Sequence, residues 1–142
     1  MYRVLLPVGG DSEHVLAAVD SVASLPNADE EVEVVILNVY EGFEVSGEAG
    51  RVDSEDVWDE ENYPEVVDTV EDRLTAAGVE TTRRREHGEP ADTIVDVAAE
   101  IDADNITMSG RHRSPTGKML FGSTTQSVLL GADRPVTVIL DE

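Results

Sequence analysis

The chain has 142 residues and no cysteine, so we expect one domain with neither disulfide bonds nor thiol chemistry. Its 31 acidic and 10 basic residues give a formal net charge of −21, which argues against nucleic acid or an anionic membrane as a partner. The sequence shows neither a signal peptide nor an apolar run near the roughly 20 residues of a membrane span, so we expect a soluble cytoplasmic protein.

So acidic a composition is typical either of a disordered chain or of a folded protein that stays soluble in concentrated salt. Hydrophobic residues make up 40% of the chain and recur with clear periodicity, which argues against disorder. In 1 M salt the Debye length falls to about 3 Å, so repulsion between surface carboxylates is screened. We therefore expect a protein from a salt-loving source, with a fold that weakens in dilute buffer.

The first half of the chain is predicted to form a strand, a helix, a second strand and a long loop. The apolar run 3–8 is typical of a strand buried on both faces, and apolar residues recur at helical spacing over 13–24, before Pro26. The β-branched run 32–40 predicts the second strand. Residues 41–65 contain ten acidic residues, which predicts a surface loop; a lid over a ligand is the alternative.

The second half continues the alternation of helices and strands. A helix over 65–77 is expected to end at Gly78, and the polar run 79–86 is typical of an edge strand. The remaining elements are a helix opened by Gly88-Glu89-Pro90, a strand at 105–108, a helix at 122–130 and a strand at 135–140.

Three consecutive arginines, residues 83–85, lie in the predicted edge strand. Because side chains alternate along a strand, Arg84 is expected on the opposite face from its two neighbours. The three cannot then act as one basic patch, and a salt-bridged edge is favoured over an anion site.

Strands that alternate with helices predict a single α/β domain with an open parallel sheet, right-handed crossovers and helices on both faces. In open sheets of this kind, ligands bind beyond the carboxyl ends of the strands, where the strand order reverses. Two loops fit that position: residues 8–12 after the first strand and residues 109–122 after the fourth.

The second of these loops is where an anion is expected to bind. Residues 111–118 hold three of the ten basic residues and no acidic one. The stretch 122–124 then opens a helix, where free N–H groups and two hydroxyls can hold a phosphate. The alternative for Ser123 is that it only caps its own helix, a role worth about 1 kcal/mol without a ligand. The three basic residues are Arg111, Arg113 and Lys118.

The residues give little support for catalysis. The segment from Gly110 to Lys118 looks at first like a phosphate-binding P-loop, but six residues rather than four separate Gly110 from Gly117, and Met119 follows the lysine. The three histidines lack metal-ligand spacing, and no nucleophile elbow is present. We therefore expect a binding protein rather than a nucleotide hydrolase.

Six short pieces of the sequence, each weak alone, form a specific pattern through their order and spacing. They are Val4-Leu5-Leu6-Pro7-Val8, Leu37-Asn38-Val39, Gly88-Glu89-Pro90-Ala91-Asp92 with Ile94, Asp104-Asn105-Ile106-Thr107-Met108, Phe121-Gly122-Ser123-Thr124-Thr125-Gln126-Ser127-Val128, and Arg134-Pro135-Val136. In this pattern the chain resembles the universal stress protein family over residues 1–142. The resemblance implies a stress-response protein with a five-stranded sheet of order 3-2-1-4-5, Rossmann-like and similar to adenine nucleotide alpha-hydrolases. It also implies a homodimer, often joined through the last strand, Val136–Leu140.

The resembling family has a branch that binds ATP through a Gly-x2-Gly-x9-Gly-Ser/Thr motif and a branch that binds no nucleotide. Gly122-Ser123 matches the end of the motif. The two earlier glycines would fall at Ser109 and His112, with Gly110 one place away from the first. The basic side chains of the loop could then supply electrostatically what the missing glycines supply through the backbone.

The adenine pocket of the family is matched in its walls but not in its polar contact. Pro7, Val39 and Met108 match the apolar walls. The aspartate that contacts adenine would fall at Gly9, and Asp11, two residues later, could replace it.

Two hypotheses follow. In the first, the protein binds ATP or AMP, with Mg²⁺ in the case of ATP. In the second, it is a dimeric regulatory protein that binds no nucleotide, and its basic loop meets another anion or an acidic partner. The candidate nucleotide or anion site consists of Pro7, Val8, Gly9, Asp11, Val39, Met108, Ser109, Gly110, Arg111, His112, Arg113, Lys118, Gly122, Ser123 and Thr124.

Overall fold

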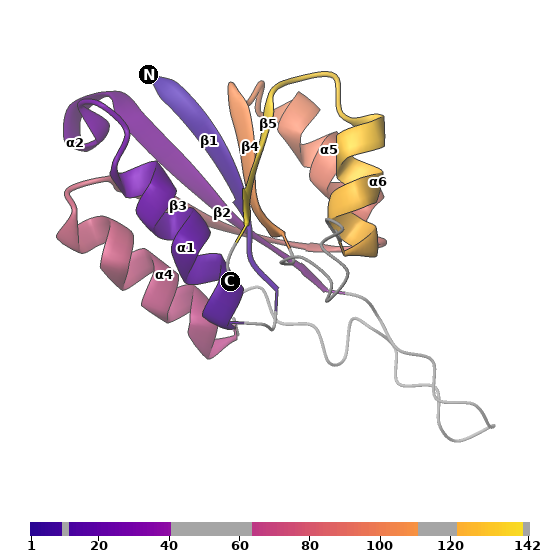
Figure 1. Cartoon of the computed structure of the whole chain (residues 1–142), viewed down its shortest axis with the longest axis horizontal. Coiled ribbons are helices and arrows are strands. Elements are labelled where there is room, and N and C mark those ends of the chain that lie inside the picture. The colour runs from indigo at the N-terminus through magenta and orange to yellow at the C-terminus, as the bar shows by residue number, and fades with distance from the viewer. Residues whose placement is uncertain (10–11, 41–63, 111–121, 141–142) are drawn as a thin grey trace.

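The computed structural model describes residues 1–9, 12–40, 64–110 and 122–140. All but the last two residues of the expected acidic loop, and the whole of the basic loop, lie outside these ranges. The described residues form a five-stranded parallel sheet of order β3-β2-β1-β4-β5, which confirms the order that the resemblance implied (Figure 1). No helix in this part of the chain is long and apolar enough to cross a membrane.

The elements follow the predicted alternation, with boundaries shifted by one or two residues. The strands are β1 (Tyr2–Pro7), β2 (Val32–Tyr40), β3 (Glu80–His87), β4 (Asn105–Gly110) and β5 (Val136–Leu140). The helices are α1 (Ser12–Ala23), α2 (Ala28–Glu31), α4 (Glu65–Ala76), α5 (Pro90–Glu100) and α6 (Ser123–Gly131).

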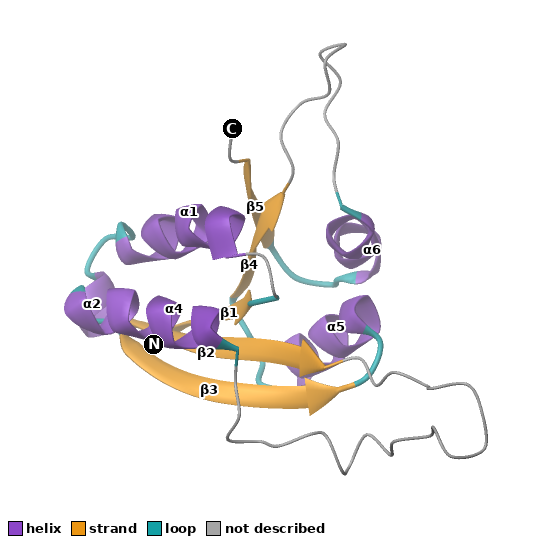
Figure 2. Cartoon of the chain, turned by 90° about the horizontal axis from the view of Figure 1, so that it is seen from below, coloured by secondary structure: helices purple, strands orange, loops and turns teal. Residues whose placement is uncertain are grey.

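Helices cover both faces of the sheet (Figure 2). On one face, α1 and α4 pack against a core that includes Leu6 and Ile36, and on the other, α5 and α6 pack against a core that includes Leu5 and Ile106. Leu5 and Leu6 are adjacent, point to opposite faces and are both fully buried. The central strand is therefore buried on both faces, as its unbroken apolar run predicted.

The short helix α2 is an element that the sequence pattern did not predict. It follows Asn27, whose φ of 56° lies in the left-handed region that asparagine tolerates better than most residues. The single turn buries Ala28 and leads directly into β2. Four residues are too few for a hydrophobic period to be visible, which is why the turn was missed.

The arginines of β3 lie as the alternation predicted. Arg83 binds Glu71 and Asp68 of α4 at 2.9 and 2.6 Å, on one face of the sheet. Arg84 binds Glu86 and Glu100 on the other face. These ion pairs confirm a salt-bridged edge, and the charges protect this edge of the sheet from pairing with another strand.

The end of α4 gives a test of the fold. Gly78 has a φ of +81°, and a Cβ there would lie 3.1 Å from the Cβ of Asp29. We expect Gly78→Ala to lower the free energy of unfolding by about 1–2 kcal/mol, because the left-handed backbone is strained for alanine. Gly131→Ala is the matched control, since its Cβ would meet only Val95, at 3.9 Å. Urea unfolding measures the stability of both variants. Equal losses of stability would contradict the left-handed backbone assigned to Gly78.

Candidate functional site

Strands β1 and β4 separate toward their carboxyl ends. The β1–β4 ladder contains only the pairs Val4–Asn105 and Leu5–Ile106, whereas β1 remains paired with β2 as far as Pro7. A gap therefore opens between two neighbouring strands at the edge where ligands bind in open parallel sheets.

The sequence of β1 explains where the strands separate. In a parallel ladder, the N–H and C=O of one residue face the same neighbouring strand, and those of the next residue face the other. Both groups of Arg3 bond to Asp104, next to β4, and both groups of Val8 bond to residues of β2. Alternation then turns Pro7 toward β4, where it has no N–H to donate, so the ladder loses one of its two hydrogen bonds at the residue where the strands separate.

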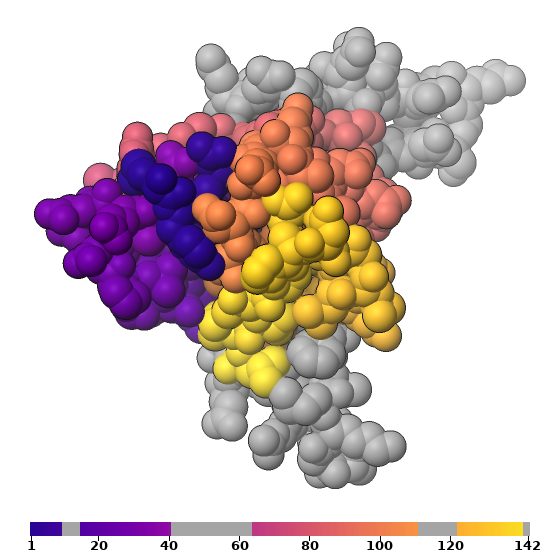
Figure 3. All heavy atoms as spheres, turned by 90° about the horizontal axis from the view of Figure 1, so that it is seen from above, coloured from indigo at the N-terminus to yellow at the C-terminus, as the bar shows by residue number. Residues whose placement is uncertain are grey.

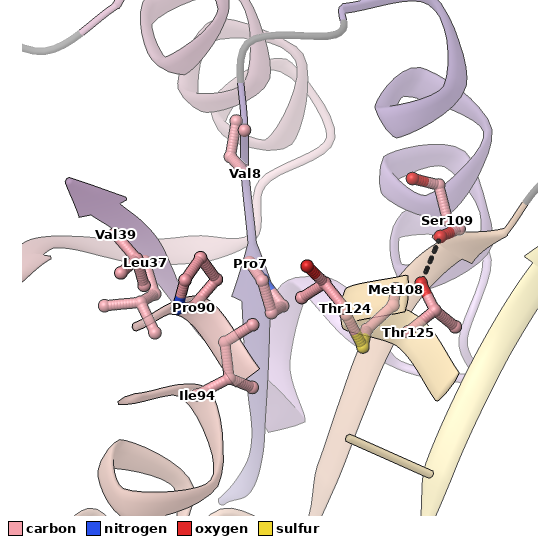
Figure 4. A pocket seen from close by; sticks show the side chains of 11 residues that line it. Pro7, Val8, Leu37, Val39, Pro90, Ile94, Met108, Ser109, Thr124 and Thr125 are labelled. Atoms are coloured by element: carbon pink, nitrogen blue, oxygen red, sulfur yellow. Dashed lines mark hydrogen bonds between the residues drawn. The ribbon is translucent and has the colours of Figure 1, made fainter. Parts of the chain in front are cut away.

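A cavity of about 270 Å³ occupies the gap (Figure 4). Its walls come from the carboxyl ends of β1, β2 and β4, from the start of α5 and from the start of α6. The lining residues are Pro7, Val8, Gly9, Leu37, Val39, Pro90, Ile94, Met108, Ser109, Thr124 and Thr125. None of these eleven described residues is ionisable, so the walls combine apolar surface with hydroxyl and backbone groups.

The start of α5, which borders the cavity, is stabilised by a helix cap. The carboxylate of Glu89 accepts hydrogen bonds from the N–H groups of Ala91 and Asp92, at 3.2 and 2.8 Å. Pro90 occupies the first helical position, as predicted, where its missing N–H costs nothing. Ile94 is buried in the core with Leu37 and Met108, and this packing places the start of α5 beside the cavity.

The start of α6 lies across the gap from β2. Its N-cap is Gly122, which has no side chain to satisfy the helix N–H groups, and Ser123 is already the first helical residue. The alternative interpretation, in which Ser123 caps its own helix, is therefore wrong. The first turn carries no acidic side chain, a composition that suits the binding of an anion to its N–H groups.

The structure brings together about half of the candidate site. Seven candidates line the cavity: Pro7, Val8, Gly9, Val39, Met108, Ser109 and Thr124. Gly110, Gly122 and Ser123 are described but do not line it. Asp11, Arg111, His112, Arg113 and Lys118 lie outside the described residues.

Four lining residues were not among the candidates: Leu37, Pro90, Ile94 and Thr125. A signal existed for each of them, since all four fall within the pieces on which the family resemblance was based. The pattern of the sequence shows only that Pro90 opens a helix, and not that this helix reaches the gap beside β1.

Outside the cavity, polar residues of the described ranges form ion pairs and ring contacts. No group of three or more His, Asp or Glu residues among them is arranged to hold a metal ion. His87 packs on Tyr40 with ring centroids 5.8 Å apart, and Arg85 lies 5.1 Å over the same ring. This cluster faces the α4 side of the sheet, away from the cavity.

The fold and cavity define an α/β protein with a recess at the carboxyl end of a parallel sheet. The model of the universal stress protein family matches residues 1–139, and the chain belongs to that family.

Solved structures agree with this assignment. A universal stress protein from Archaeoglobus fulgidus is 28% identical over 98% of both chains, with a TM-score of 0.75. A universal stress protein from the same organism in complex with dAMP is 23% identical over 98% of both chains, with a TM-score of 0.68. A family protein from Arabidopsis thaliana with AMP bound is 13% identical, with a TM-score of 0.69, over 100% of this chain and 93% of that one. A search of curated proteins finds no match.

A hydrogen bond between β4 and α6 gives the second test. The hydroxyl of Thr125 donates to the carbonyl of Ser109 at 3.3 Å and so ties the start of α6 to the end of β4. We expect Thr125→Val to lower the free energy of unfolding by about 1 kcal/mol, measured by urea unfolding.

Thr124→Val is the matched control for this test. No hydrogen bond joins the Thr124 hydroxyl to another described residue, so this variant should unfold at the same urea concentration as the parent. Equal losses of stability in the two variants would contradict the hydrogen bond from Thr125 to Ser109.

Proposed function

We propose that this stress-response protein binds an adenine nucleotide, ATP or AMP, in the cavity between β1 and β4 and acts as a regulator rather than an enzyme. The observation that carries the proposal is the cavity itself, an apolar recess at the point where the strand order reverses. The dAMP and AMP in structures of similar fold favour an adenine nucleotide over other anions.

The arrangement of the walls indicates how the nucleotide would lie. The base would pack against Pro7, Val39 and Met108, which are apolar and have no group that must be desolvated. The phosphate would meet the first turn of α6 at Gly122 and Ser123. The basic side chains of Arg111, Arg113 and Lys118, together with Mg²⁺ in the case of ATP, would complete its neutralisation.

Gly9 offers a way to close the cavity without disturbing the core. It lines the cavity, and a Cβ built on it meets no atom within 4 Å. We expect AMP at 100 times its Kd to stabilise the parent protein by about 2.7 kcal/mol. Gly9→Trp should abolish that gain, because the indole would occupy the ligand's space.

Thermal melts in molar salt, with and without millimolar AMP or ATP, measure this difference. The melting temperature of ligand-free Gly9→Trp is the control and should equal that of the parent. A parent protein that neither nucleotide stabilises would refute nucleotide binding and favour the second candidate function.

That second candidate is a dimeric regulatory protein without nucleotide, and the edge strand β5 favours the dimer in either case. β5 has no charged residue, and none of its five side chains is fully buried, whereas β3 at the other edge carries ion pairs. The residues of α6 and β5 gather on one face of the molecule (Figure 3). Leu130 of α6 is 82% exposed. We propose that a second copy pairs along β5, because an uncharged apolar edge is otherwise a site of aggregation.

A charge placed on β5 tests the dimer. Val138→Glu would put two carboxylates close together across a two-fold interface, so we expect it to shift the protein to monomer. Thr82→Glu is the matched control, because it adds the same charge to the opposite edge strand. Sedimentation equilibrium at constant salt measures both, and the dimer along β5 is refuted if Val138→Glu sediments as the parent does.

The proposal also covers the acidic surface of the protein and its location in the cell. A net charge of −21 is suited to concentrated salt, where repulsion between carboxylates is screened, so we propose a salt-adapted member of the family. We also propose that it works in the cytoplasm, where adenine nucleotides are abundant.

A further inference from the structure

We infer that the hydroxyl of Thr124 recognises the ligand directly, by a hydrogen bond to a hydroxyl of its pentose. This inference rests on the proposed function and assigns one side chain to one part of the ligand. It also sets the chemical class of the ligand, a nucleoside or nucleotide with an intact sugar rather than a free base or a simple anion.

Two adjacent threonines of α6 line the cavity but have different roles. The hydroxyl of Thr125 is used within the protein, since it donates to the carbonyl of Ser109. The hydroxyl of Thr124 makes no hydrogen bond to another described residue, although the residue is half-buried and lines the cavity. A half-buried hydroxyl without a protein partner is suited to a partner supplied by a ligand.

The position of Thr124 indicates which part of the ligand it meets. Figure 4 shows its side chain beside Pro7 and Met108, with the hydroxyl turned away from the methionine sulfur and into the open space of the cavity. Pro7 and Met108 form the apolar surface that suits a ring, and the first turn of α6 suits a phosphate. Thr124 belongs to that first turn, and its side chain extends from it to Pro7 and Met108, so it lies where a nucleotide bound across both regions has its sugar.

The described lining contains few other groups for this task. The eleven lining residues include no carboxylate, amide or basic side chain, and the Thr125 hydroxyl is already bonded. Ser109 carries the remaining hydroxyl, and its strand position places that side chain with Thr107 on the opposite face of β4 from Met108. Thr124 is therefore the side chain of this lining best placed to bond a sugar.

The test compares Thr124→Val with Thr124→Ser in the full chain, by calorimetric titration in molar salt. Valine has the shape of threonine without the hydroxyl, and serine keeps the hydroxyl. One hydrogen bond corresponds to about a fivefold change in affinity. We expect Thr124→Val to bind both AMP and adenosine about fivefold more weakly, and Thr124→Ser to remain within about twofold of the parent.

Sugar analogues identify the contact. We expect 2′-deoxyadenosine or 3′-deoxyadenosine, whichever lacks the partner hydroxyl, to bind the parent and Thr124→Val equally. The inference is overturned if Thr124→Val binds AMP as the parent does, if the loss is confined to AMP, or if both deoxy analogues still lose fivefold. A parent protein that binds neither AMP nor adenosine refutes the proposed function itself. A parent and a Thr124→Val variant that bind AMP with equal affinity refute only the role of Thr124.

Discussion

Pro7 faces β4 without an N–H to donate, and the architecture of the candidate site depends on that missing donor. Strand β1 stays paired with β2 through Pro7 but loses β4 after Leu5. The two central strands diverge just before they end, and the space between them becomes the cavity. The same proline then forms part of the apolar wall. One residue thus interrupts the sheet and lines the space that the interruption creates.

Most of the fold could be predicted from the sequence, because its elements have strong and different periods. The run 3–8 has no polar face, so it had to be central, while the arginines of 79–86 could only be tolerated at an edge. Alternation of strands and helices implied parallel pairing, and the strand order came from the resemblance to a family. The turn α2 could not be predicted, because it depends on the left-handed backbone of Asn27 rather than on a pattern.

The candidate site was predictable only where it follows a strand end. Pro7, Val39 and Met108 end their strands at the same edge of a parallel sheet, so their meeting follows from topology alone. Pro90 and Ile94 reach the cavity through the docking of α5, which is a tertiary effect that local pattern does not contain. The roles of Thr124 and Thr125 depend on which way each hydroxyl turns, and neighbouring threonines in a sequence are indistinguishable in that respect.

We propose that the cavity holds an adenine nucleotide although Ser109 and His112 stand where the family's motif has glycine. Mass spectrometry of small molecules released from freshly purified protein, kept in molar salt throughout, tests this most directly. We expect ATP, ADP or AMP at near-stoichiometric yield. A protein that carries no nucleotide, and that shows no melting shift with millimolar ATP, would contradict it and place the chain in the branch of the family that binds none.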